Sequence, residues 1–306
     1  MSPKPSQAPA SSVLAALQEQ DSALAAGARV SAAIPCYNGA RWIRDVVAAL
    51  RQQTHVPDEL LVIDDGSTDG SGALAADAGA RVVTHAVNRG LSAARNTALA
   101  VAGGDILVFV DSDAYADRGM LEALLAQFTA RDIAGVGGGG VEAHQVTRAD
   151  AWRARHARQW HGARRLEDAP YLHGLCAAYR RRALFAVGGF DTRLRTNAED
   201  VEMGLRLRRA GYRLVYTPDA VVYHQRADTL STLAKMIDRW YYWAARVRRS
   251  GQDRPWRLFA GVVRSAVVHP VQDVREMRPD LAGISLLMAG VKARAIVRGL
   301  TTAERS

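Results

Sequence analysis

Short strand-like runs alternate with helix-like stretches from residue 30 to residue 110. The predicted strands cover residues 30–34, 60–63, 81–84 and 106–110, and the predicted helices between them cover residues 42–50, 73–78 and 91–102. Strands that are separated by helices pair in parallel, and the helices then cover both faces of the sheet. This alternation therefore predicts an α/β fold with a Rossmann-like, doubly wound sheet.

The alternation becomes irregular after residue 140. The predicted elements there are helices at 151–164 and 199–210, a strand at 175–179, and two short strands at 213–216 and 220–223 around a turn at Pro218 and Asp219. From residue 230 onward the pattern indicates helix throughout. We therefore expect a mixed sheet with a helical C-terminal extension. The expected divisions are a mobile tail (1–27), an α/β domain (28–225) and a basic helical region (226–306).

The 306-residue chain carries a net charge of +9, and nearly all of this excess lies in its last quarter. Residues 225–306 hold fifteen Lys or Arg residues and seven Asp or Glu residues. A local basic excess can bind anionic lipid or nucleic acid, or it can belong to solvated helix faces. The two cysteines, Cys36 and Cys176, are far apart, which excludes a disulfide framework and fits a reducing compartment.

The first 27 residues are rich in Ala, Ser, Pro and Gln. Their apolar stretch at residues 13–17 is too short, and its surroundings too polar, for a signal peptide. No stretch reaches the roughly 18 apolar residues of a membrane span, and residues 284–289 come nearest. We therefore expect a cytoplasmic protein.

Two carboxylates, Asp111 and Asp113, directly follow the predicted central strand. Ligands of open α/β sheets bind at the carboxyl ends of the strands. Paired carboxylates there suit Mg²⁺ or Mn²⁺, which in turn bind phosphate oxygens. The alternatives are a simple turn and an aspartyl phosphatase. A phosphatase motif is expected earlier in a chain, with Thr or Val at the position of Tyr115.

Three other groups carry candidate chemistry. Asp64 and Asp65 follow the second predicted strand in a loop that resembles a calcium loop but lacks its final bidentate Glu. Glu199 and Asp200 begin a predicted helix, where the helix dipole favours carboxylates, or where one of them acts as a general base. His224 ends the last predicted strand and is either a satisfied structural residue or part of a metal site.

Residues 135–140 match the dinucleotide-binding fingerprint letter by letter. The match is weak because no convincing helix begins at Gly140 and no acidic residue follows about 20 positions later. We expect instead a glycine-rich strand that passes close to a ligand.

Six motifs, taken together and in order, resemble the inverting family 2 glycosyltransferases of the GT-A fold. They are VSAAIPCYNG (30–39), LVIDDGSTDG (61–70), GLSAARN (90–96), GDILVFVDSDA (104–114), GGFD (188–191) and AEDVEMGLRLRRAGY (198–212). The resemblance covers about residues 29–225 and departs at Ala198, where relatives often have Gly. It implies a GT-A-type sheet, a nucleotide-sugar donor and a divalent metal, Mn or Mg, and it favours the metal-binding interpretation of the two aspartates after the central strand.

The resemblance also implies a role for each matched residue. On the donor side, it implies that Pro35 and Tyr37 border the nucleotide base. It implies that Asp65 hydrogen-bonds this nucleotide base and that Asp64 supports the loop. Arg95 is implied to lie near the nucleotide, and Asp111 to contact the ribose or the metal. The implied metal ligands are Asp113, Asp111 and His224. Asp200 is implied to be the catalytic base, with Glu199 beside it. Trp160 and His173 lie in loops that we expect on the acceptor side.

The implied reaction is a single displacement that inverts the anomeric centre. A metal offsets charge on the leaving diphosphate, and a carboxylate on the opposite face removes the proton of an acceptor hydroxyl. The acceptor is expected to be a cell-surface or lipid-linked glycan, as in polysaccharide biosynthesis. The competing hypothesis is a non-catalytic module that binds a nucleotide sugar on the same fold.

The basic C-terminal region begins with an aromatic cluster, residues 240–243. One hypothesis is that this region docks on an anionic membrane surface, which would place the protein at the inner face of the cell membrane. Alternatively, its aromatic residues pack onto the catalytic domain or form a homodimer interface. We expect no nucleic-acid partner.

Overall fold

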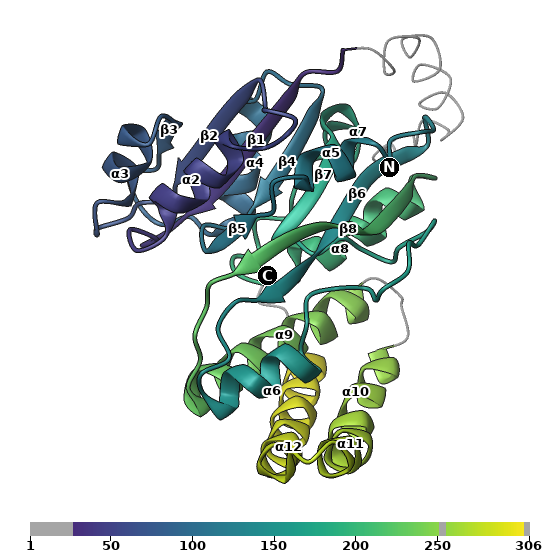
Figure 1. The fold of residues 1–306 in the computed structure, drawn as a ribbon. Coiled ribbons are helices and arrows are strands. Elements are labelled where there is room, and N and C mark those ends of the chain that lie inside the picture. The colour runs from purple at the N-terminus through teal and green to yellow at the C-terminus, as the bar shows by residue number, and fades with distance from the viewer. Residues whose placement is uncertain (1–26, 251–254, 303–306) are drawn as a thin grey trace.

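The computed structural model describes residues 27–250 and 255–302, so the predicted tail lies outside the described residues except for Gly27. A curved mixed sheet with its own covering helices forms one part of the molecule, and a group of helices lies beneath it (Figure 1). Strands β6 and β8 point toward this group of helices (Figure 1).

The sheet has eight strands in the order β3-β2-β1-β4-β7-β6-β8-β5. They are β1 (Val30–Cys36), β2 (Glu59–Asp64), β3 (Arg81–Thr84), β4 (Ile106–Val110), β5 (Ala114–Ala116), β6 (Ile133–Glu142), β7 (Cys176–Arg180) and β8 (Arg213–His224). The four strands from β3 to β4 are parallel, as the alternating pattern predicts, and β7 pairs antiparallel with both β4 and β6. The predicted mixed α/β sheet is confirmed.

Helices cover both faces of this sheet. They are α2 (Ile43–Arg51), α3 (Ser71–Asp77), α4 (Leu91–Val101), α5 (Met120–Leu125), α7 (Arg181–Ala186) and α8 (Glu199–Arg209). Side chains alternate along a strand, so β1 presents Ile34 to α2 on one face and Ala33 to α4 on the other. Two apolar layers result, and both are fully enclosed.

The remaining helices form a separate group beneath the sheet. They are α6 (Arg148–His156), α9 (Leu230–Ser250), η1 (Pro255–Leu258), α10 (Phe259–Val263), η2 (Arg264–Val268), α11 (His269–Arg275) and α12 (Pro279–Thr301). Trp152 of α6 is fully buried between α9 and α12, and its indole Nε1 donates to Ser285 Oγ at 2.8 Å. Within the described residues, none of these helices is long and apolar enough to cross a membrane.

Two predicted elements differ from the structure. The helix expected at 151–164 begins earlier, at Arg148, because Thr147 and Asp150 form a capping box, and it ends at His156. The two short strands expected around Pro218 are one strand, β8, whose pairing with β6 continues across the predicted turn with a register shift between Gly137 and Gly139. The short elements β5, α5 and α7 were not predicted, because three to six residues carry too little periodicity.

The glycine-rich segment is a strand, but its glycines accommodate protein rather than a ligand. A Cβ on Gly135 would lie 2.8 Å from the ring of Tyr179, and one on Gly138 would lie 2.2 Å from the carbonyl oxygen of Ala220. The close neighbours are therefore β7 and β8, and the predicted close approach of a ligand is wrong for these positions.

Candidate active site

A cavity of about 440 Å³ lies between the carboxyl end of β4 and the helical group. Its lining brings together five of the residues predicted from the sequence, namely Arg95, Asp111, His173, Glu199 and Asp200. Asp111 follows β4 directly, and Glu199 and Asp200 begin α8. Residues more than 80 positions apart in the sequence thus share one cavity.

Arg95 holds the acidic residues of this cavity in place. Its side chain is only 2% exposed, and it donates from Nη1 to Glu199 Oε1 at 2.8 Å and from Nη2 to the carbonyl oxygen of Gly174 at 3.1 Å. Nη2 also lies 3.5 Å from Asp111 Oδ1. A Cβ at residue 174 would lie 2.3 Å from Nη2, so the glycine there makes room for the guanidinium. Arg95 thus ties the end of β4 to the start of α8, a role that the sequence did not indicate.

The first turn of α8 is entered through an unusual backbone conformation. Ala198, its N-cap residue, has a φ of 67°, in the left-handed region that glycine adopts at low cost. A glycine at this position would adopt the same conformation at lower cost. The turn places Glu199 and Asp200 side by side at the cavity, and Asp200 Oδ1 accepts a hydrogen bond from the backbone N–H of Val201 at 2.8 Å.

The environment raises the pKa of the three cavity carboxylates, Asp111, Glu199 and Asp200. Burial raises the pKa of Asp111 to about 6, although the charge of Arg95 opposes the shift. Burial likewise raises the pKa of Glu199 and of Asp200, again against the charge of Arg95. A carboxylate with a raised pKa is a stronger base, so this group is suited to accept a proton.

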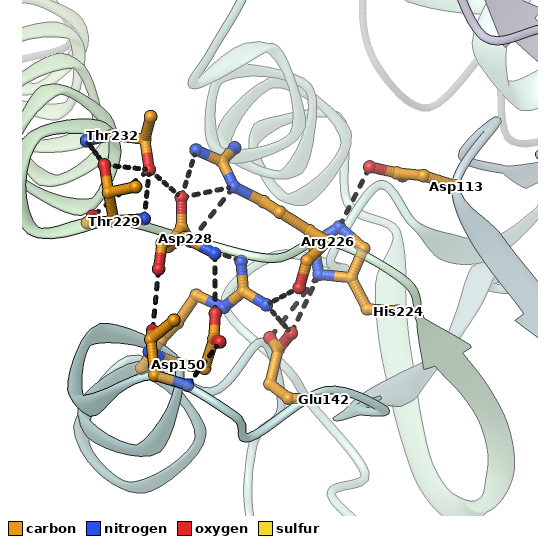
Figure 2. A network of polar contacts seen from close by, with 10 residues as sticks. Asp113, Glu142, Asp150, His224, Arg226, Asp228, Thr229 and Thr232 are labelled. Atoms are coloured by element: carbon orange, nitrogen blue, oxygen red, sulfur yellow. Dashed lines mark hydrogen bonds and ion pairs between the residues drawn. The ribbon is translucent and has the colours of Figure 1, made fainter. Parts of the chain in front are cut away.

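A second set of polar contacts begins at Asp113 and leads away from the sheet (Figure 2). His224 Nε2 lies 3.4 Å from Asp113 Oδ2, and His224 Nδ1 lies 3.1 Å from Glu142 Oε2. Arg153 is 1% exposed and donates to Glu142 Oε2 and to Asp228 Oδ2, both at 2.5 Å. Strand β8 contributes His224 to this network, strand β6 contributes Glu142, and helix α6 contributes Arg153.

The network continues to the start of α9 (Figure 2). Asp228 accepts a hydrogen bond from Thr232 Oγ1 at 2.6 Å, and its backbone N–H donates to Asp150 Oδ1 at 2.6 Å. A continuous chain of buried polar contacts therefore connects Asp113, beside the cavity, to the helix that forms its opposite wall.

The network raises the pKa of His224. Burial alone would lower its pKa, but the hydrogen bonds to Asp113 and Glu142 outweigh burial and raise the pKa to about 9. Its charge in turn helps to lower the pKa of Asp113, against burial. No three His, Cys, Asp or Glu side chains in the described part of the chain are grouped to hold a metal ion. The predicted trio of Asp111, Asp113 and His224 is therefore not a preformed site, because Asp111 faces Arg95 and His224 faces two carboxylates.

The other predicted donor residues lie outside the cavity lining. Pro35 is buried in β1, and Tyr37 follows that strand with half of its surface exposed. Asp64 accepts from the backbone N–H of Ser67, which organises the loop after β2. Asp65 is buried, and its two oxygens accept hydrogen bonds from the backbone N–H groups of residues 89 and 90, with His85 Nδ1 at 2.6 Å. Its contact with a nucleotide base stays a prediction.

The two residues expected on the acceptor side differ in position. His173 lines the cavity and stacks on His161, and burial lowers its pKa to about 3, so its ring is neutral. Trp160 lies under the guanidinium of Arg158 and is not part of the lining.

The opposite wall of the cavity was missed by the sequence analysis. It is formed by Tyr171 and by residues of α9 and α12, among them Trp240, Tyr241 and Lys292. The aromatic cluster at the start of the C-terminal region was the only signal, and two of its members turn toward the cavity. The packing alternative is therefore favoured by the structure, and docking on a membrane stays a prediction.

The family model described as glycosyl transferase family 2 matches residues 31–187. The chain is 30% identical over 291 residues to the pre-mycofactocin glycosyltransferase of Mycobacterium tuberculosis, and the match covers 90% of this chain and 59% of that protein. It is also 30% identical over 218 residues to the O-antigen chain rhamnosyltransferase RfbN of Salmonella typhimurium, covering 66% of this chain and 68% of that protein. The chain thus spans less than two thirds of the mycobacterial relative.

Among solved structures, a mannosyltransferase of Pyrobaculum calidifontis in complex with GDP-Man and Mn²⁺ has a similar fold. The TM-score is 0.66 at 22% sequence identity, and the match covers 91% of this chain and 88% of that one. The similarity extends over the sheet and into the helical group.

We predict that Arg153→Met strongly destabilises the fold, because it leaves Glu142 and Asp228 buried without their cation. Breaking a buried ion pair from one side costs about 3–5 kcal/mol, measured as the free energy of unfolding in urea. The control is Arg148→Met on the same helix, where an exposed arginine lies 4.0 Å from Asp280. This control should have the free energy of unfolding of the wild type. Equal losses of stability in both variants would contradict the role of Arg153 as the cation that Glu142 and Asp228 require.

Proposed function

The chain belongs to glycosyl transferase family 2, and on that premise we propose that it moves a sugar from a nucleotide-diphosphate donor to an acceptor hydroxyl by single displacement, with inversion. The observation that carries this proposal is the shared cavity, in which Asp111 lies 3.5 Å from Arg95 and Asp200 belongs to the same lining. Membership in the family supports this proposal over an aspartyl phosphatase and over a non-catalytic module.

Asp200 is the proposed general base. It lines the cavity at the start of α8, and burial raises its pKa. An acceptor hydroxyl becomes a better nucleophile as its proton passes to such a carboxylate during attack. Arg95 donates a hydrogen bond to Glu199 Oε1. The buried Oε2 atom of Glu199 has no hydrogen-bond partner among the described residues, so it is free to accept a hydrogen bond from a hydroxyl of the acceptor sugar.

Asp113 and Asp111 are the proposed carboxylates for a divalent cation, Mn²⁺ or Mg²⁺. The donor set fits, because both side chains are about one-third exposed and offer the hard oxygen ligands that these cations prefer. Such ions are usually held by one or two carboxylates together with substrate phosphates, so a preformed three-ligand site is not required. When bound, the cation would offset negative charge on the leaving diphosphate. The mannosyltransferase of similar fold, solved with GDP-Man and Mn²⁺, supports this proposal.

His224 is proposed to orient Asp113 and to stand as a further candidate ligand of the cation, with Glu142 holding its other ring nitrogen. Its Nε2 lies 3.4 Å from Asp113 Oδ2, and its Nδ1 lies 3.1 Å from Glu142 Oε2. The hydrogen-bonded partners of a ligand fix its orientation and tune its affinity. Arg153 completes this support because it neutralises Glu142.

We predict that Asp200→Asn reduces kcat for transfer by about 10²- to 10⁴-fold, as expected for loss of a general base, and leaves the affinity for donor and Mn²⁺ unchanged. In the wild type, protonation of Asp200 removes activity. The apparent pKa of the acidic limb of the kcat–pH profile should therefore lie above the pKa of an ordinary aspartate, about 3.9. Transfer is followed with radiolabelled donor, and donor binding is measured by calorimetry at each pH.

The control for this variant is Glu202→Gln on the same helix, whose side chain pairs with Arg206 and does not line the cavity. It should retain transfer. A normal kcat in Asp200→Asn would rule out the base assignment, whereas loss of donor binding would indicate that Asp200 acts on the donor instead.

We predict that Asp113→Asn weakens Mn²⁺-dependent binding of a nucleoside diphosphate by at least about tenfold, because a neutral amide replaces an anionic ligand. The binding is measured by calorimetry for several nucleoside diphosphates, which also identifies the base. The control is Asp117→Asn, which lies four residues on and accepts a hydrogen bond from Gly119. If Mn²⁺ strengthened binding equally in wild type and Asp113→Asn, Asp113 would not be the metal ligand.

A further inference from the structure

Charge is segregated along the cavity. Within the described residues, its acidic lining side chains are Asp111, Glu199 and Asp200, all near Arg95 at the sheet. The positively charged side chains of the lining other than Arg95 come from the loop after α6 and the C-terminal helices, namely Arg158, Arg248, Arg257 and Lys292. Burial lowers the pKa of the two lining histidines, His156 and His173. A ligand that fills the cavity therefore meets carboxylates at one end and cations at the other.

Lys292 is the most constrained of these cations. It is 4% exposed, and Nζ donates to Ser265 Oγ at 2.7 Å. Nζ also lies 5.0 Å from the ring centre of Tyr241 and 5.7 Å from that of Trp152. Across the described ranges no carboxylate forms an ion pair with it. Burying an ammonium group without a counter-ion is costly, and burial lowers its pKa to about 8. An anionic group of a ligand in the cavity would stabilise its charge.

Aromatic side chains occupy the wall between the two ends. Trp240 and Tyr241 of α9 line the cavity together with Tyr171. Burial raises the pKa of Tyr171 to about 12, so its hydroxyl keeps its proton and can donate a hydrogen bond. Amphipathic aromatic surfaces of this kind suit a sugar or another ring that carries polar groups.

We propose that the acceptor carries an anionic group, a carboxylate or a phosphate, which Lys292 binds while an acceptor hydroxyl faces Asp200. This inference rests on the proposed function, because it takes Asp200 as the base. The cavity volume of about 440 Å³ is that of a small-molecule pocket. Charge-assisted hydrogen bonds from a buried ammonium to an anion are stronger than those between neutral groups, so Lys292 discriminates charged from neutral acceptors.

The test uses three 4-nitrophenyl β-glycosides that differ only at C6 of the sugar: the glucoside, the glucuronide and the glucoside 6-phosphate. Binding to the full chain is followed by quenching of tryptophan fluorescence, without donor and in EDTA so that no metal-dependent anion site competes. The glucuronide or the 6-phosphate should bind at least about tenfold more tightly than the glucoside, and the tighter of the two identifies the anion.

Lys292→Met should abolish this preference, since methionine keeps the volume of the side chain and removes its charge. Lys235→Met is the matched control, because Lys235 is an exposed lysine of α9 outside the cavity and its loss should leave the preference intact. Arg158→Gln is a second variant at an exposed lining position, where the substitution should leave the stability of the fold unchanged. It should reduce the preference for the anionic glycosides. Folding is checked by circular dichroism melting.

Equal binding of the three glycosides to the wild type would overturn the proposal. A preference that survived in every folded variant of Lys292 and Arg158 would also overturn it. These binding measurements need neither donor nor metal, so a negative result contradicts only the anionic acceptor. A wrong proposed function would instead appear as the absence of metal-dependent donor binding and of sugar transfer.

Discussion

The site depends on one buried interaction, the contact of Arg95 with the carboxylates of Glu199 and Asp111. Three acidic residues around one buried cation would otherwise repel one another and disfavour the closed arrangement of β4 and α8. The guanidinium compensates this repulsion only in part, and burial leaves the pKa of each carboxylate raised. The interaction with Arg95 therefore assembles the cavity, and burial keeps its carboxylates basic against the charge of Arg95.

A second constraint joins the sheet to the helical group. Glu142 at the end of β6, Arg153 on α6 and Asp228 before α9 form a buried charge network that no solvent reaches. At one end of this network, Glu142 contacts His224, which contacts Asp113. At the other end, Asp228 accepts a hydrogen bond from the first turn of α9, the helix that carries Trp240 and Tyr241. The two walls of the cavity are thus fixed relative to each other by charge as well as by apolar packing. The C-terminal helices are part of the site on this account.

The sequence predicted the sheet well because buried strands and amphipathic helices have different periods, and β3 and β4 have the predicted bounds. It also identified Asp111, Glu199 and Asp200 as candidates, since polar residues at strand and helix ends stand out from apolar runs. It could not predict what Arg95 contacts, because both partners are distant in sequence. Nor could it place Lys292, one basic residue among many in a helix, at the cavity. The continuous strand β8 was missed because Pro218 indicated a turn, whereas pairing with β6 keeps the segment extended.

We propose that the diphosphate leaves from one face of the donor sugar while the acceptor hydroxyl, with Asp200 as its base, attacks the other face in a single displacement. The most direct measurement is the anomeric configuration of the product, read from its proton NMR coupling after transfer from a donor of known configuration. The account predicts an inverted product, β from an α-linked donor. A product with retained configuration would contradict it, because retention requires a different geometry from a single base facing the departing diphosphate across the sugar.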